Sequence, residues 1–161
     1  MTQSSQPGAV VRTVNPTANF DPQSAVTIAV DTAYVVSMGG GSINTGVYMF
    51  DNRLTNGSSG EGTLELNSRV NLGDLVGFEV VPINPNSNDT VSITGFQVSS
   101  GSVFGSTGYP IQDSPDGSYW VGQAINANAQ VTTYQIQIKV TTGGIRPASY
   151  YVTWDPFIRL N

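Results

Sequence analysis

The most constraining feature of the sequence is a strict alternation of apolar and polar side chains near the C-terminal end. Apolar residues occupy the even positions and polar residues the odd ones in the run Tyr134-Gln-Ile-Gln-Ile-Lys-Val140. Successive side chains of an extended strand point to opposite faces, so this period predicts a strand with one buried and one solvent-facing side. No window has the spacing of an amphipathic helix, so we expect fewer than about a fifth of the residues in helices. Further strands are expected near residues 9–14, 26–31, 33–37, 45–51, 63–67, 74–83, 90–99, 117–124 and 149–154.

Turn residues separate these runs along the whole chain. The 18 glycines and 9 prolines fall with Asn, Asp and Ser between the apolar segments, as at Asn56-Gly57 and Gly143-Gly144. Glycine reaches positive φ and proline fixes φ for a turn, so short connections between strands are expected. The pattern predicts an all-β fold, a two-sheet antiparallel β-sandwich of the jelly-roll kind. The side chains expected inside are Ile28, Leu64, Leu66, Ile136, Ile138 and Val152, and those expected outside are Gln135, Gln137 and Lys139.

One predicted strand changes the parity of its apolar residues. Val91 and Ile93 share one parity, whereas Phe96 and Val98 have the other. A β-bulge adds one residue to a strand and resets its pleat. The sequence therefore predicts a bulge at Gly95.

The length of 161 residues fits one domain, and the absence of cysteine means that its core forms without disulfides. Residues 1–8 are polar and are expected to be a flexible segment before a single β-sandwich domain over 9–161. The start of the chain lacks the basic and apolar parts of a secretory signal, and no apolar run is long enough to span a membrane. We therefore expect a cytoplasmic protein, a location in which an inclusion can form. Export without a visible signal is the alternative.

Charged and nucleophilic side chains are scarce in this chain, which has no histidine, no cysteine, 6 basic and 11 acidic residues. Catalytic triads, Cys–His pairs and the usual zinc sites need the missing residue types, so we expect a non-enzymatic protein. The formal net charge of −5 and the scattered arginines disfavour a nucleic acid as partner, because phosphate binding needs clustered cations.

The segment Ser99–Gly117 is long and polar for a connection inside a domain, which is typical of a functional loop. Asp113 and Asp116 lie close together in it, and carboxylate oxygens are ligands that Ca²⁺ prefers. Tyr119 and Trp120 follow and point to opposite faces of a strand, so one of them is expected at the surface. These four residues are a predicted ligand site, with calcium as its candidate cofactor. An ordinary turn without metal is the alternative, because Asp-Ser-Pro-Asp-Gly is also a good turn sequence.

A second candidate ligand site is the sequence Trp154-Asp155-Pro156. In a sugar-binding role, Trp154 or Tyr151 would stack on a sugar ring and Asp155 would accept hydrogen bonds from its hydroxyl groups. In a structural role, Trp154 would pack in the core, Asp155 would cap a turn and Pro156 would end the strand. The structural role is favoured, because aromatic side chains commonly fill cores.

The other carboxylates have simpler interpretations. Asp31 is expected on the polar face of a strand, and Asp51-Asn-Arg53 is expected to form a turn with a local ion pair. A glycosidase would need two carboxylates within about 5–10 Å of each other in a cleft. The acids considered for such a pair are Glu61, Glu65, Asp74 and Glu79.

The C-terminal segment Ala148–Ile158, with its Trp-Asp-Pro sequence, resembles the closing segment of the AidA/PixA inclusion body family of bacteria. Other features are similar to that family in the same order: an opening strand over 25–32 that ends in Val30-Asp-Thr, Val47-Tyr-Met, the turn Gly60–Leu64, and Val70–Asp74 before a strand. The resemblance covers roughly residues 25–161. It implies a small non-enzymatic β-sandwich, and some members of the family accumulate as intracellular crystalline inclusions.

Two functions from different classes follow from these observations. The first is a self-associating protein of the inclusion body type. Its polar strand faces carry few charges, so electrostatic repulsion between two copies is weak. A homo-oligomer is expected, with symmetric dimers the commonest form. The alternative is a carbohydrate-binding, lectin-like module, with or without calcium, since sandwich folds often carry such sites on their loops.

Overall fold

Strands dominate residues 22–161, the part of the chain that the computed structural model describes. The strand expected near 9–14 and the segment 1–8 lie outside the described residues. The helices are α1 (Thr32–Met38) and the short 3-10 helix η2 (Leu54–Asn56). The strands are β1 (Ser24–Val30), β2 (Gly41–Ser42), β3 (Val47–Asp51), β4 (Asn67–Val70), β5 (Leu75–Pro82), β6 (Thr90–Gln97), β7 (Ile111–Gln112), β8 (Tyr119–Gln123), β9 (Thr132–Thr133), β10 (Gln135–Thr141), β11 (Ser149–Trp154) and β12 (Phe157–Leu160).

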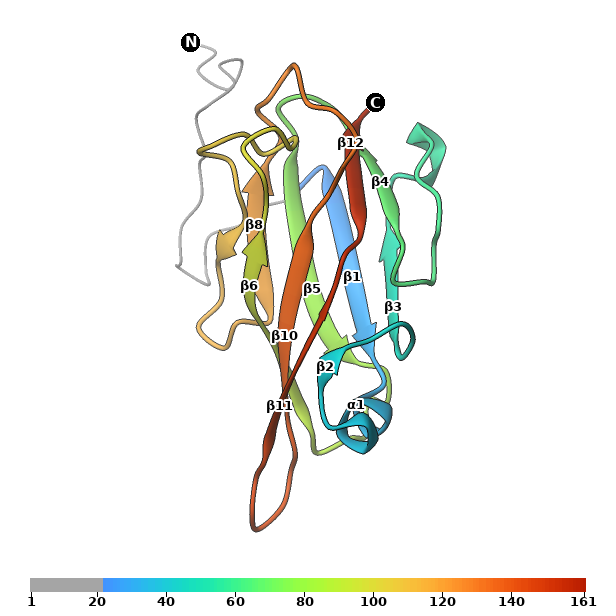
Figure 1. Ribbon diagram of the computed structural model, residues 1–161, viewed down its shortest axis with the longest axis vertical. Coiled ribbons are helices and arrows are strands. Elements are labelled where there is room, and N and C mark those ends of the chain that lie inside the picture. The colour runs from blue at the N-terminus through green and yellow to red at the C-terminus, as the bar shows by residue number, and fades with distance from the viewer. Residues whose placement is uncertain (1–21) are drawn as a thin grey trace.

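The described strands form three sheets (Figure 1). Their strand orders are β3-β1-β5-β8-β7, β2-β11-β10-β6 and β4-β12-β9. The all-β prediction is confirmed, but the expectation of two purely antiparallel sheets is wrong, because β1–β5, β2–β11 and β4–β12 are parallel pairs. Alternation along a strand records which face is buried and not the direction of its neighbour, so the sequence pattern could not reveal these pairs. The jelly-roll connectivity remains a prediction.

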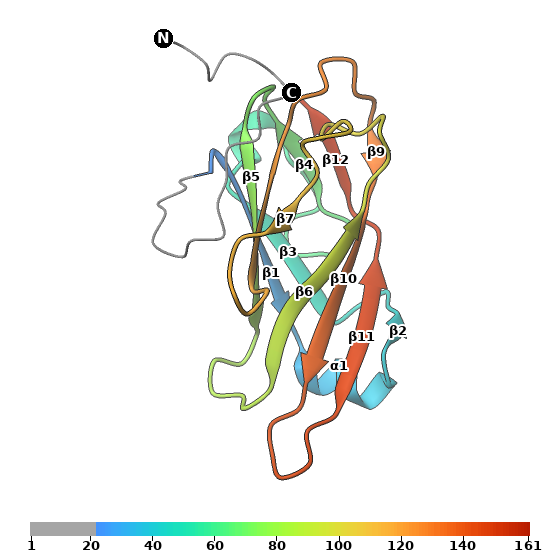
Figure 2. The ribbon, with the colours of Figure 1, turned by 90° about the vertical axis from the view of Figure 1, so that its left-hand side faces the viewer.

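The core lies between the five-stranded sheet on one side and the other two sheets, which follow one another along the opposite side (Figure 2). Side chains from β1, β5, β10 and β11 meet there, and Ile136 and Ile138 of β10 lie opposite Trp154 and Val152 of β11. Of the six side chains predicted inside, five are fully buried and Leu64 is partly buried. Gln137 on the outer face is exposed, and its neighbours Gln135 and Lys139 are half-buried.

The predicted bulge lies between β6 and β10. Gln137 pairs with Gly95 and Ile138 pairs with Ile93, so Thr94 is the additional residue. This insertion lets Ile93 and Phe96 both face the core despite their opposite parity.

Residues 33–37 form helix α1 and not the predicted strand. The carboxylate of Asp31 caps the helix by accepting a hydrogen bond from the Tyr34 backbone N–H at 3.1 Å, and Gly39 ends it with a left-handed φ of 77°. Val35 and Val36 favour a strand, but these two caps outweigh that preference. Asp31 is therefore a helix cap and does not lie on a strand face, which corrects the sequence-based interpretation.

The glycines after α1 allow two chain segments to approach closely. A Cβ on Gly40 would lie 2.7 Å from the carbonyl oxygen of Tyr151, and the φ of Gly40 is +85°. Only glycine fits such a position without strain. This close approach places β2 beside β11, so the run Gly39–Ser42 is part of a sheet contact and not only a flexible connection.

The strand predicted at 63–67 begins at Asn67, at the end of that range. Thr63 forms an isolated bridge with Met49, and Leu64 and Glu65 lie in turns. Leu66 is nevertheless fully buried, as predicted. Neither α1 nor η2, the helices of residues 22–161, is long and apolar enough to cross a membrane.

Candidate functional site

The long Ser99–Gly117 segment is anchored in the core. Ser102, Val103 and Phe104 are fully buried. The Phe104 ring lies 6.4 Å from the rings of both Phe78 and Tyr134, measured between centroids. The backbone oxygen of Val103 also accepts hydrogen bonds from the N–H groups that follow β8. Packing therefore accounts for much of the length that suggested a functional loop.

The two carboxylates predicted as calcium ligands have different environments. Asp113 is buried, with 7% of its surface exposed, and its backbone N–H donates to the carbonyl of Tyr119. Asp116 is exposed, and one of its oxygens accepts hydrogen bonds from the Ser114 hydroxyl and from the backbone and hydroxyl groups of Ser118, at 2.7–3.0 Å. The hydrogen bonds from Ser118 lower the pKa of Asp116. This carboxylate thus stabilises a turn, which the sequence analysis gave as the alternative to a calcium site.

No group of three or more His, Cys, Asp or Glu side chains within residues 22–161 is arranged to hold a metal ion. Calcium binding by Asp113 and Asp116 would have to recruit its other oxygens from backbone carbonyls, amides or water. It remains a prediction.

Both aromatic residues beside this turn are half-buried. The Trp120 indole N–H donates to the carbonyl oxygens of Ile93 and Gly117 at 3.2 Å, and its ring packs 5.5 Å from that of Phe96. Tyr119 lies over Gly77, where an added Cβ would meet its hydroxyl group. Each ring already has close contacts within the chain, and each also keeps part of its surface in solvent, so the two differ less in exposure than was expected.

Trp154 is buried, with 3% of its surface exposed. Its indole N–H donates to the sulfur of Met49 at 3.1 Å. Asp155 is exposed at the junction between β11 and β12, and Tyr151 is half-exposed on β11. The burial of Trp154 supports its structural role, because no face of this ring is open to a sugar.

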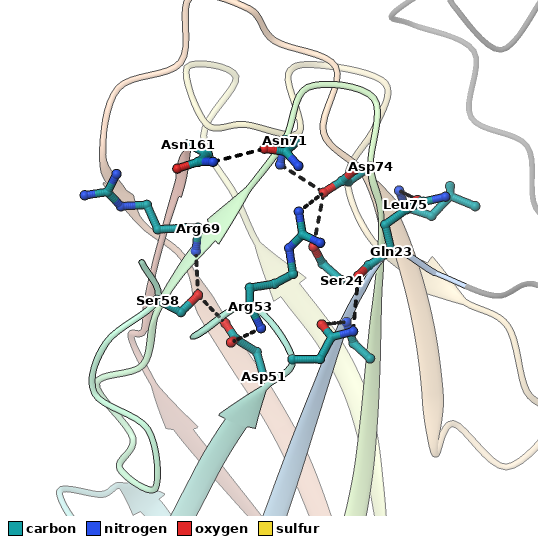
Figure 3. Close-up of polar contacts among 12 residues, drawn as sticks. Gln23, Ser24, Asp51, Arg53, Ser58, Arg69, Asn71, Asp74, Leu75 and Asn161 are labelled. Atoms are coloured by element: carbon teal, nitrogen blue, oxygen red, sulfur yellow. Dashed lines mark hydrogen bonds and ion pairs between the residues drawn. The ribbon is translucent and has the colours of Figure 1, made fainter. Parts of the chain in front are cut away.

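A polar network that the sequence did not predict lies where β1 begins and β3 ends (Figure 3). Asp74 is one of its centres. A single oxygen of this carboxylate accepts hydrogen bonds from the Ser24 hydroxyl at 3.3 Å, the Arg53 guanidinium at 3.2 Å and the Asn71 N–H at 2.9 Å. The side chains of Arg53 and Asp74 are 16% and 11% exposed, so this ion pair is shielded from solvent. The expected local pair within Asp51–Arg53 is therefore wrong.

Asp51 is the second centre of the network. One oxygen of its carboxylate accepts from the hydroxyls of Ser58 and Ser68 at 2.8 and 2.7 Å, and the other accepts from the Arg53 N–H at 2.8 Å. The Ser58 hydroxyl in turn accepts from the Arg69 N–H. These contacts connect the end of β3 to η2 and β4, so the network links the five-stranded sheet to the three-stranded sheet.

Glu61 and Tyr134 adjoin this second centre. A Glu61 oxygen accepts a hydrogen bond from the Asp51 N–H at 2.9 Å. Burial raises the pKa of Glu61, and the nearby Asp51 carboxylate raises it further. Burial also raises the pKa of Tyr134, whose hydroxyl has no hydrogen-bond partner among residues 22–161. Glu61 was named from the sequence as a candidate for a carboxylate pair, but Asp51 was not. The two residues are ten positions apart, and only the folded chain brings them into contact.

Glu61 should make stability depend on pH in a definite direction. Its raised pKa means that the folded state holds a proton at a pH where the unfolded state has released it. The pH window runs from 4.5, the ordinary pKa of a glutamate, up to the raised pKa of Glu61 in the folded state. Within this window the free energy of unfolding should fall as pH rises. Glu61→Gln, which stays neutral and keeps an acceptor oxygen, should remove this part of the fall in urea unfolding measured across that range. Glu65→Gln, at an exposed site nearby, is the matched control. Identical slopes for wild type and Glu61→Gln would contradict the assignment.

Comparison with known proteins supports the fold and adds a family. The structure is similar to that of the inclusion body protein PixA from Burkholderia cenocepacia J2315, with a TM-score of 0.67 and 21% identity over 90% of this chain and 99% of that one. This likeness confirms, at the level of the fold, the resemblance to the AidA/PixA family that the sequence motifs indicated. No curated protein matches the sequence. Residues 23–145 match a family described as a domain of unknown function, DUF8788, and the chain belongs to that family.

Proposed function

We propose that this protein is non-enzymatic and self-associates into assemblies of the inclusion body type. The observation that carries the proposal is the polar, weakly charged outer face of the four-stranded sheet, and the fold shared with an inclusion body protein over nearly the whole length of both chains agrees with it. At 21% identity this likeness concerns the fold, so the case for association rests on this chain's own surface.

The outer face of the four-stranded sheet is polar but carries little charge. Thr94 and Gln137 are exposed on it, and the threonine hydroxyl donates to the glutamine side chain at 2.9 Å. A surface hollow of about 190 Å³ lies beside them and is lined by Gln97 and Gln135. Such a face repels a second copy weakly, because only Lys139 adds a charge to this part of β10.

Two of the sheet edges, at β3 and β6, are less suitable for association. At the β3 edge, the N–H and the carbonyl of Met49 are already bonded to Thr63 and Gly62. At the β6 edge, the Ile93 N–H donates to Gly117 and its carbonyl accepts from Trp120. Covered edges resist strand-to-strand pairing, which favours association through side chains.

The polar network adds support for a structural role. Both oxygens of Asp51 accept hydrogen bonds from within the chain, and Asp74 is held by the guanidinium group of Arg53. A carboxylate with these partners is poorly suited to act as a nucleophile or base, which needs a lone pair directed at substrate.

Self-association predicts a size that depends on concentration, because association follows mass action. In analytical ultracentrifugation from about 1 to about 500 µM, the weight-average mass should rise steadily above that of one chain. A monomer that persists over the whole range would overturn the proposal. Parallel samples with calcium and with simple sugars test the alternative, since a shift in mass or melting temperature caused by either addition would favour a lectin-like module.

A further inference from the structure

The hairpin between β10 and β11 presents an isolated apolar side chain to solvent. It projects beyond the rest of the molecule, at the lower end in Figure 1. Ile145 lies at its tip and is 100% exposed, and residues 143–149 around it are exposed as well. Arg146 follows directly, so the tip combines an apolar group with a positive charge.

The base of the hairpin loop is held in place by hydrogen bonds. The Thr142 N–H donates to the Ala148 carbonyl at 2.9 Å, and the Ala148 N–H donates to the Thr142 hydroxyl at 2.9 Å. The Gly143 N–H donates to the Asp89 carboxylate at 3.1 Å, which fastens this base to the loop before β6. These bonds fix the base of the hairpin, so the tip loses fewer positions when it binds than the tip of an unanchored loop would.

A surface hollow of about 340 Å³ lies along β3 and the turn that precedes β4. Tyr48 and Leu64 are half-buried parts of its lining, and Glu65 is an exposed acid on it. Its volume is near the lower limit of about 300–1,000 Å³ for small-molecule pockets, which suits one or two side chains. Strand β3, whose residues line the hollow, runs at the side of the molecule, whereas the hairpin is at one end (Figure 1).

We infer that Ile145 of one copy inserts into the hollow of a second copy, where Arg146 pairs with Glu65. The charges are complementary, and the Arg53–Asp74 pair is the one ion pair within residues 22–161, so both groups are available to a partner. Arg146 is also one of only 6 basic residues in a chain with a net charge of −5, so a positive tip is attracted to the otherwise acidic surface of another copy. This inference rests on the proposed self-association and names the contact that produces it.

The contact would join two different surfaces, because each copy has both a hairpin tip and a hollow. Such head-to-tail contacts do not saturate in a dimer, and they give open chains unless a ring closes. A contact made by one loop is much smaller than the interface of a stable dimer, so assembly needs a high protein concentration. Growth without a fixed end point is what an intracellular inclusion requires.

The test measures the assembly of single variants by sedimentation velocity. Ile145→Asp should raise the concentration needed for assembly at least about tenfold, because it removes the apolar contact with Tyr48 and Leu64 and places a second carboxylate beside Glu65. Arg146→Glu and Glu65→Arg should each weaken assembly by reversing one charge, and the double variant Arg146→Glu/Glu65→Arg should restore it. The matched control is Val131→Asp, at a half-exposed apolar residue outside the hairpin and the hollow, which should assemble as the wild type does.

A mixing experiment tests the head-to-tail geometry. Ile145→Asp keeps an intact hollow and Glu65→Arg keeps an intact tip, so an equimolar mixture should form 1:1 pairs that neither variant forms alone. Melting curves verify that each variant is folded. The proposed contact is wrong if Ile145→Asp and Glu65→Arg assemble as well as the wild type does. It is also wrong if Val131→Asp loses as much assembly as these two variants. In both cases the wild type still assembles, so the proposed function stands. If the wild type stays monomeric, the proposed function fails first.

Discussion

Replacement of Phe78 by alanine is expected to lower the free energy of unfolding by about 3–5 kcal/mol, the usual loss for a buried phenylalanine. Phe78 lies in β5 and is fully buried. Its ring centroid is 4.8 Å from that of Phe96, 6.0 Å from that of Tyr134 and 6.4 Å from that of Phe104. The substitution would open a cavity where the five-stranded sheet meets the rest of the core. Denaturant unfolding followed by tryptophan fluorescence measures the loss.

Phe50→Ala is the matched control, because it makes the same chemical change at a side chain that is 46% exposed. Its cost should be well below that of Phe78→Ala, since part of the ring is in water in the folded state. Phe78→Leu, which keeps most of the volume, should lie between the two. Equal losses for Phe78→Ala and Phe50→Ala would mean that the aromatic cluster is not the centre of the core.

Parts of this cluster could be predicted from the sequence and parts could not. The strand that contains Phe78 and the parity change before Phe96 follow from alternation, which needs only local information. Phe104 lies in a polar segment without period, so its burial depends on contacts with distant residues. This segment was expected to be a functional loop because it is long and polar for a connection inside a domain.

Helix α1 shows a different limit. Its signals were present, since Asp31 is a good N-cap and Gly39 a good C-terminal residue. Val35 and Val36 suggested a strand, and a helix of this length has too few residues to show a periodic pattern. Short helices are therefore recognised by their ends and not by their middle.

The candidate site was harder to predict than the fold. Trp154 is buried and Asp116 is hydrogen-bonded within its turn, as their structural interpretations expected, and ligand binding near this turn remains a prediction. The polar network was missed, because Arg53 pairs with Asp74 and Asp51 contacts Ser68 only after β3, β4 and β5 are placed. Isolated acids in turns carry no signal of their partners, so no local pattern could have identified this network.

Asp74→Ala is expected to lower the free energy of unfolding by about 2–4 kcal/mol, because it leaves the buried Ser24 hydroxyl and the shielded Arg53 guanidinium without their acceptor. The Ser24 hydroxyl, the Arg53 guanidinium and the Asn71 N–H would all lose their acceptor. Ser24 is 1% exposed, so water cannot easily replace the lost bond. Urea unfolding at neutral pH measures the effect, with Asp155→Ala, at an exposed aspartate, as the control.

A double-mutant cycle separates the ion pair from the rest of the network. Arg53→Ala alone should be costly, since it leaves the shielded Asp74 carboxylate without its counter-charge. In the Asp74→Ala background the same substitution should cost much less, because no carboxylate remains to be compensated. Asp74→Asn, which keeps an acceptor oxygen but no charge, should fall between wild type and Asp74→Ala. If Asp74→Ala costs no more than Asp155→Ala, or if the two alanine substitutions are simply additive, then the network does not hold the five-stranded and three-stranded sheets together. Should the coupling be found, these carboxylates stabilise the scaffold, and the surface outside the network remains the place to look for function.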